Sequence, residues 1–150
     1  MKPKTLLIGL DGATFTVLNP LMNQGVMPFL KSFLAGGVQA GLRTIVPPLT
    51  PPAWTSLMTG RKPGQHGVFD FFRMESPESR HIRFFTSHDV GCDTIWSLAS
   101  QQGQRVAAFN FPAMFPAPRI NGYVVPGWVP WRQFVDTEEG GNRRGQGCGE

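Results

Sequence analysis

The sequence predicts an α/β fold with a mostly parallel sheet, because strand-like and helix-like segments alternate along the chain. Continuous apolar runs at Thr5–Leu10 and Arg105–Phe109 are typical of parallel strands that are buried on both faces. The segments between the predicted strands carry apolar residues at helical spacing and often end at glycine. With 150 residues, of which 41% are hydrophobic, the chain is long enough to bury a core.

The first half of the chain carries signals for where its elements begin and end. The predicted first strand is closed by Asp11 and Gly12, and Pro28 stands near the first turn of a helix, where its missing N–H is tolerated. Gly36 and Gly37 stop that helix. The expected elements are a buried strand at Thr5–Leu10, helices at Thr14–Gln24 and Pro28–Leu34, and an alternating strand at Val38–Val46.

The second half begins with a proline-rich stretch from Pro47 to Pro52, which predicts irregular structure around Thr50. Further on, Asp93 is a suitable cap for a helix whose apolar face includes Trp96, and Gly103 ends that helix. The expected elements are a helix at Ala53–Thr59, a hairpin or an insertion within Val68–Val90, a helix at Asp93–Gln102, a buried strand at Arg105–Phe109 and a short strand at Tyr123–Val125.

The composition changes near the end of the chain. Thr137–Glu150 has no large apolar residue and contains five glycines, so it adds little to a core. We therefore expect residues 1–136 to belong to one folded domain. Residues 137–150 are expected to be either a disordered tail or the product of a truncated or frame-shifted reading frame, and we favour the second.

Charge, cysteine content and hydropathy exclude several classes of function. The net charge of +4 is mild and no Lys/Arg stripe stands out, so nucleic-acid binding is not expected. No segment approaches the ~20 apolar residues that a membrane helix needs. Cys92 and Cys148 are far apart and form no CxxC pair, which suits a reducing compartment and predicts a cytoplasmic protein.

Asp11 and Thr50 are the residues whose positions suit chemistry. Asp11 directly follows the first predicted strand, and ligands of open α/β sheets bind at the carboxyl ends of strands. Thr50 precedes a helix, whose amino terminus offers unpaired N–H groups to a phosphate. A threonine alkoxide needs a strong activator, and a divalent metal held partly by Asp11 is the natural candidate. Taken alone, each has an ordinary interpretation, as a turn residue and as a helix cap.

Asp11 and Thr50 lie within two of three short sequence motifs that follow one another along the chain. LIGLDG at residues 7–12, TPPAWTSLMTG at residues 50–60 and PGQHG at residues 63–67 resemble the type I phosphodiesterase and nucleotide pyrophosphatase family of the alkaline phosphatase superfamily. One of these motifs alone would be weak evidence for the family, but the three motifs in this order are specific. The resemblance is close from Lys4 to Phe69 and looser from Asp93 to Trp128.

This resemblance implies an alkaline-phosphatase-like α/β domain, of which the chain holds the amino-terminal portion. It also implies a hydrolase of phosphodiester or pyrophosphate bonds with Thr50 as the nucleophile, and with Asp11 and Thr50 as ligands of two divalent metals. Zinc is the expected metal and manganese is a possibility. The implied partner is a small phosphodiester or nucleotide-type substrate, with no nucleic acid and no membrane. Many members carry asparagine where Ala53 stands, so a contact to the phosphoryl oxygen is either lost here or comes from another residue. Without a cysteine at the nucleophile position, sulfatase chemistry is not expected.

A dinuclear zinc site needs about six protein ligands, mostly His and Asp. In the family the later ligands come from segments that have no counterpart in this sequence. We interpret His66 as structural, and His81 and His88 as surface residues. Trp128 and Trp131 are more compatible with packing than with a substrate cleft. Two hypotheses therefore stay open, a metal-dependent hydrolase of which this chain is a fragment, and an inactive remnant without a complete metal site.

Overall fold

The computed structural model describes residues 4–74, 76–79 and 81–127. The predicted tail at 137–150, Trp128 and Trp131 lie outside these residues. The chain divides into two compact units, Met1–Arg43 and Thr44–Glu150, and each is described by itself. Helices and two short sheets, one of them a parallel pair, confirm the predicted α/β class and are consistent with an incomplete alkaline-phosphatase-like domain.

The first unit contains two short helices. Helix α1 (Phe15–Asn23) begins after Thr14, whose side-chain oxygen accepts a hydrogen bond from the backbone N–H of Thr16 and so caps the helix. Helix α2 (Pro28–Ala35) has proline in its first turn and ends at Gly36. Both helices agree with the sequence prediction to within one residue at each end.

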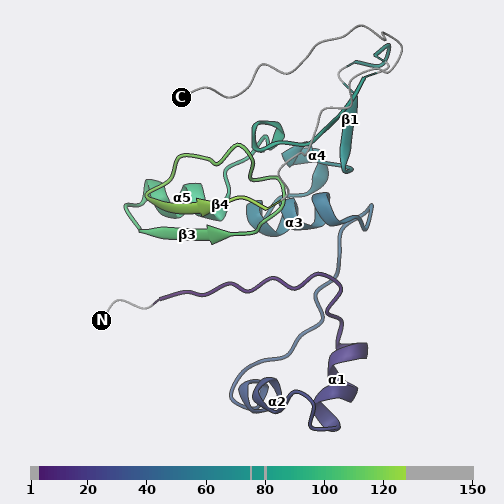
Figure 1. Cartoon of the computed structure of the whole chain (residues 1–150), viewed down its shortest axis with the longest axis vertical. Coiled ribbons are helices and arrows are strands. Elements are labelled where there is room, and N and C mark those ends of the chain that lie inside the picture. Colours follow the sequence, from purple (N-terminus) through teal and green to yellow (C-terminus); the bar gives the residue numbers. More distant parts are fainter. Residues whose placement is uncertain (1–3, 75, 80, 128–150) are drawn as a thin grey trace, which may run out of the picture. The chain divides into compact units, whose positions relative to one another are not determined.

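The two strands predicted for the first unit are wrong. Thr5–Leu10 and Val38–Val46 form neither helix nor strand, and most of their apolar side chains are exposed (Figure 1). A strand is stable only when a neighbouring strand takes up its backbone N–H and C=O groups. The described residues of this unit include no other strand, so an apolar run alone does not make a sheet here.

The second unit opens with helix α3 (Thr50–Thr59), which begins at Thr50 and not at Ala53 as predicted. The expectation that the proline stretch is irregular as far as Pro52 is therefore wrong. Proline has no backbone N–H, and the first N–H groups of a helix have no acceptor within the helix, so Pro51 and Pro52 fit its first turn. Gly60 ends the helix in the left-handed conformation, with φ of 65°.

A short helix and a hairpin follow α3. Helix α4 (Pro63–His66) is a single turn that ends at Gly67. Strands β1 (Phe72–Met74) and β2 (Ile82–Phe84) pair in antiparallel fashion, which confirms the hairpin alternative for this aromatic segment. The 3₁₀ turn η1 (Ser87–Asp89) comes directly after the hairpin.

The parallel pair lies at the end of the described chain. Helix α5 (Ile95–Gln101) is capped by Thr94 rather than by Asp93, because the Thr94 hydroxyl accepts from the backbone N–H of Ser97. Strands β3 (Val106–Phe109) and β4 (Gly122–Val125) pair in parallel, close to the predicted positions. Figure 1 shows α5 lying against this pair, as expected for a covered parallel sheet.

The core of the second unit lies where α3, α5 and β3 meet. Its buried members are Met58, Trp96, Ala108, Phe111 and Met114. The partly buried Trp54 of α3 packs against this cluster, so the helix that carries Thr50 is anchored along one side. In the described part of the chain, none of the helices has the length and apolar character needed to cross a membrane.

Candidate active site

Thr50 is the first residue of α3 and is half-buried. Leu49 precedes it in an extended conformation and makes no side-chain cap. Two backbone hydrogen bonds nevertheless fix the chain on either side of Thr50. The N–H of Leu49 donates to the Pro47 carbonyl at 2.9 Å, and the N–H of Ala53 donates to the Leu49 carbonyl at 3.0 Å. The backbone on both sides of Thr50 is therefore held in place before any ligand binds.

The prolines limit what this helix start can offer to an anion. Thr50, Pro51 and Pro52 are its first three residues, and two of these have no N–H. The next N–H, that of Ala53, already donates to Leu49. The expectation that the amino terminus of α3 presents several N–H groups to a phosphoryl group is therefore wrong. The helix dipole remains, but cations or other donors must neutralise most of the phosphoryl charge.

Helix α3 is fixed by contacts farther along its length. Trp54, one turn after Thr50, packs edge to face on Phe111 with ring centroids 5.4 Å apart. The buried hydroxyl of Thr55 donates to the Pro51 carbonyl at 2.8 Å. Met58 is 1% exposed and belongs to the core cluster. These contacts give Thr50 a rigid support.

His66 is fully buried at the end of α4, and both of its ring nitrogens have partners. The backbone N–H of Val68 donates to Nδ1 at 3.1 Å, so Nδ1 carries no proton. The neutral ring therefore has its proton on Nε2, which lies 2.9 Å from Ser56 Oγ and donates to it. In this arrangement His66 is not a base for Ser56 and has no lone pair left for a metal, which supports its structural interpretation.

Burial lowers the pKa of His66 below its ordinary value of 6.5, although a hydrogen bond to the backbone of Pro52 acts in the opposite direction. The ring is thus neutral near pH 7, as the hydrogen bond from the Val68 N–H to Nδ1 requires. Sequence reasoning identified His66 but missed Ser56, which stands on α3 and receives the imidazole because the PGQHG turn folds α4 back onto that helix. His81 and His88 are exposed, as predicted.

Asp11 lies in a turn that leads into α1, and its side chain is exposed. Gly12, with φ of 68°, takes the left-handed conformation that this turn requires. The position after an extended segment agrees with the prediction, but that segment is not a strand. Asp11 belongs to the first unit and Thr50 to the second. Their joint metal site therefore stays a prediction.

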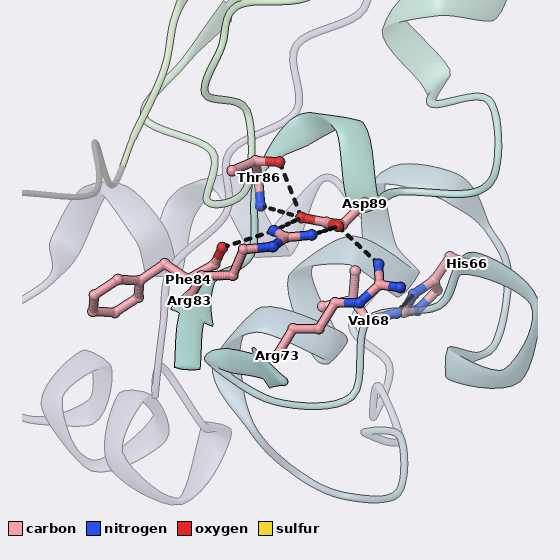
Figure 2. A network of polar contacts seen from close by, with 7 residues as sticks. All are labelled: His66, Val68, Arg73, Arg83, Phe84, Thr86 and Asp89. Carbon is pink, nitrogen blue, oxygen red and sulfur yellow. Dashed lines mark hydrogen bonds and ion pairs between the residues drawn. The ribbon is translucent and has the colours of Figure 1, made fainter. Parts of the chain in front are cut away.

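Sequence reasoning missed a polar network at the base of the hairpin, shown in Figure 2. The carboxylate of Asp89, on η1, accepts hydrogen bonds from Arg73 on β1 and Arg83 on β2. Those from Arg83 hold the pKa of the Asp89 carboxyl well below its usual range, against the opposing effect of burial. Arg73 and Arg83 face each other across the hairpin, a pairing that depends on the strand register and that the sequence alone does not give. Two like charges at paired positions predict an anion nearby.

Within residues 4–74, 76–79 and 81–127, no three His, Cys, Asp or Glu side chains form a group that could hold a metal ion.

Comparison with known proteins adds one finding. A family model described as type I phosphodiesterase / nucleotide pyrophosphatase matches residues 5–146. No solved structure matches the chain.

Proposed function

Because the chain belongs to the type I phosphodiesterase / nucleotide pyrophosphatase family, we propose that it carries the nucleophile of a hydrolase for phosphodiester or pyrophosphate bonds. The family implies hydrolase activity of this kind on small phosphodiester or nucleotide substrates. We assign the nucleophile to Thr50 and a metal-ligand role to Asp11 and Thr50. The observation that carries the proposal is the place of Thr50 at the first position of α3.

That place suits a nucleophile for two physical reasons. The positive end of the helix dipole lowers the cost of forming an alkoxide at Thr50. The contacts of Trp54 and Met58 hold α3, so the backbone that carries Thr50 need not be ordered when substrate binds. In the proposed reaction the Thr50 oxygen forms a bond to phosphorus as the bond to the leaving alcohol or nucleotide breaks. Water then releases the phosphoryl group from Thr50.

The family is typically metal-dependent, and the donors proposed here are a carboxylate and a hydroxyl. Oxygen donors suit zinc or manganese, but two of them do not make a site. A bound divalent ion would supply Lewis acidity, which lowers the pKa of a coordinated hydroxyl and offsets phosphoryl charge. The start of α3 provides few N–H donors to a phosphoryl group. The proposed reaction therefore depends on a cation more strongly than it would at a helix start without prolines.

The second candidate is a catalytically inactive, truncated remnant without a complete metal site. It is favoured by the finding that the described residues gather no group of three metal-ligating side chains. The hydrolase proposal, by contrast, requires further ligands to be encoded beyond Glu150, in the same frame or in a shifted one. Sequencing that region and translating all three frames tests this. An Asp-His-Gly motif with further Asp and His residues is expected, and its absence from every frame would favour the inactive remnant.

The enzymatic test compares this chain with the extended protein, meaning the reading frame continued to those ligands. Hydrolysis of bis(4-nitrophenyl) phosphate is measured with zinc and after chelation. We expect zinc-dependent turnover by the extended protein and none by the 150-residue chain. In the extended protein, Asp11→Ala should lower turnover by roughly a hundredfold or more, in line with the loss of a metal ligand. Asp70→Ala, at an exposed aspartate, is the matched control and should keep normal turnover.

A further inference from the structure

The network around Asp89 holds more positive than negative charge. Its carboxylate is only 4% exposed and takes a two-point contact from Arg83, with Nη1 at 2.7 Å from Oδ2 and Nη2 at 2.6 Å from Oδ1. The backbone N–H and the hydroxyl of Thr86 also donate to Oδ2, at 2.9 and 3.0 Å. Arg73 Nη1 donates to Oδ1 at 2.9 Å. The Asp89 carboxylate thus accepts hydrogen bonds from two guanidinium groups and from Thr86. Two positive charges and one negative charge give the cluster a net charge of +1.

Arg83 and Arg73 differ in their hydrogen bonds to Asp89 and in their exposure to solvent. Arg83 uses both of its terminal nitrogens on Asp89 and is 30% exposed. Arg73 uses one nitrogen and is 50% exposed. A guanidinium group has five N–H donors. Within the described residues, Arg73 donates one hydrogen bond to Asp89 and half of its side chain is exposed, so it can donate further hydrogen bonds to a ligand.

The hairpin also holds Arg73 in place. Its Cα is paired with that of Arg83 in the β1–β2 register, and like charges at paired positions are destabilising. Figure 2 shows the bridge from Arg73 to Asp89. This bridge removes part of that cost and restricts the Arg73 side chain. A guanidinium group that is restricted before binding loses less conformational entropy when a ligand arrives.

We propose that Arg73 is the binding residue of a phosphate-type oxyanion site at the base of the β1–β2 hairpin. Two adjacent donors of a guanidinium fork match two oxygens of a phosphate group, and one negative charge of the phosphate offsets the surplus positive charge of the cluster. The site uses neither Thr50 nor a metal, so it goes beyond the proposed function. Its ligand is a phosphate group, either free or attached to a nucleotide.

The test is a titration of the folded 150-residue chain with sodium phosphate, without metal and at constant ionic strength. The Nε–Hε signal of Arg73 is followed by ¹⁵N NMR. We expect a saturable shift with a dissociation constant of roughly millimolar order, as suits a single partly exposed cation. A parallel titration with adenosine monophosphate separates the two sources. Tighter binding of the nucleotide indicates a substrate phosphoryl group, and equal binding indicates free phosphate.

Three variants make the test specific. Arg73→Gln should abolish the saturable shifts around the hairpin. Arg73→Lys keeps the charge and can still reach Asp89 but loses the fork, so binding should weaken about tenfold. Arg105→Gln, at an exposed arginine of the same unit, should bind phosphate like the unchanged chain. If Arg73→Gln unfolds the hairpin, the Lys variant decides.

Two results would overturn the site. One is an Arg73 signal that shifts no more with phosphate than with chloride at equal ionic strength. The other is an Arg73→Lys variant that binds as tightly as the unchanged chain. Thr50→Ala should leave phosphate binding intact, so failure of the nucleophile assignment and failure of this site are distinguishable.

Discussion

The imidazole of His66 is joined to Ser56 by a 2.9 Å hydrogen bond, which ties α4 to the middle of the helix that begins with Thr50. Val68 holds the other side of the ring through its backbone N–H. The support of the candidate nucleophile therefore includes a neutral, fully buried histidine. This relationship can be tested without any enzymatic activity.

Removing the partner of His66 should destabilise the second unit. Ser56→Ala removes one partner of the buried Nε2–H while the Pro52 backbone remains, and we expect the free energy of unfolding to fall by about 0.5–1.5 kcal/mol. Urea denaturation followed by circular dichroism measures the change. Ser76→Ala, at an exposed serine of the same unit, should alter stability by less than about 0.5 kcal/mol. Equal effects of the two substitutions would contradict the buried hydrogen bond.

The stability of the chain should depend on the protonation of His66. Burial lowers its folded-state pKa below the ordinary 6.5, so the unfolded chain takes up a proton first as the pH falls. The stabilisation is fully present above pH 6.5 and is lost progressively below it. Urea midpoints measured between pH 7.5 and 5 should decrease, and His66→Gln should flatten the curve. A His66→Gln variant with an unchanged pH profile would exclude His66 as the cause, since His81 and His88 remain in it.

The left-handed conformation of Gly60 at the end of α3 can be tested by comparing alanine substitutions at Gly60 and Gly64. Its φ of 65° lies in the left-handed region, and a Cβ added there meets no atom within 4 Å. Gly60→Ala should therefore cost only backbone strain, about 1 kcal/mol. Gly64→Ala also enters open space, but at an ordinary φ inside α4, so it should be neutral or slightly stabilising. The reverse order in thermal melts would refute the described end of α3.

Asp89 should matter more than other carboxylates of the second unit. Asp89→Asn removes the charge that lies between Arg73 and Arg83, so two like charges then face each other across the hairpin. We expect a loss of about 1–3 kcal/mol in the free energy of unfolding. Asp70→Asn, at an exposed position, is the matched control and should change little. A loss at Asp89 no greater than at Asp70 would mean that the network contributes nothing to stability.

Helices α1, α2 and α5 and the two strands of the parallel pair could be predicted because their signals are local. Pro28 and Gly36 mark both ends of α2, and the apolar face of α5 follows from the spacing around Trp96. The strand at Val106–Phe109 was visible as an apolar run. In each case the information lies within a few neighbouring residues.

The rest depends on partners that are distant in sequence. The apolar run Thr5–Leu10 has the composition of a strand, but composition does not supply the neighbouring strand that pairing requires. The start of α3 at Thr50 was missed because proline was interpreted as a breaker, although it is tolerated in the first turn. The Asp89 network needs the hairpin register, which brings Arg73 opposite Arg83. Of the candidate site, the position of Thr50 beside a helix start was predictable and its hydrogen-bonding surroundings were not.

The central claim is that Thr50 is the nucleophile. The most direct measurement is the zinc-dependent hydrolysis of bis(4-nitrophenyl) phosphate by the extended protein, with Thr50→Ala compared to Thr44→Ala. Thr44 is an exposed threonine of the same unit and controls for the loss of a hydroxyl. The account predicts that Thr50→Ala lowers turnover by roughly a thousandfold or more, while Thr44→Ala stays within about twofold of the unchanged protein. Near-normal turnover by Thr50→Ala would contradict it.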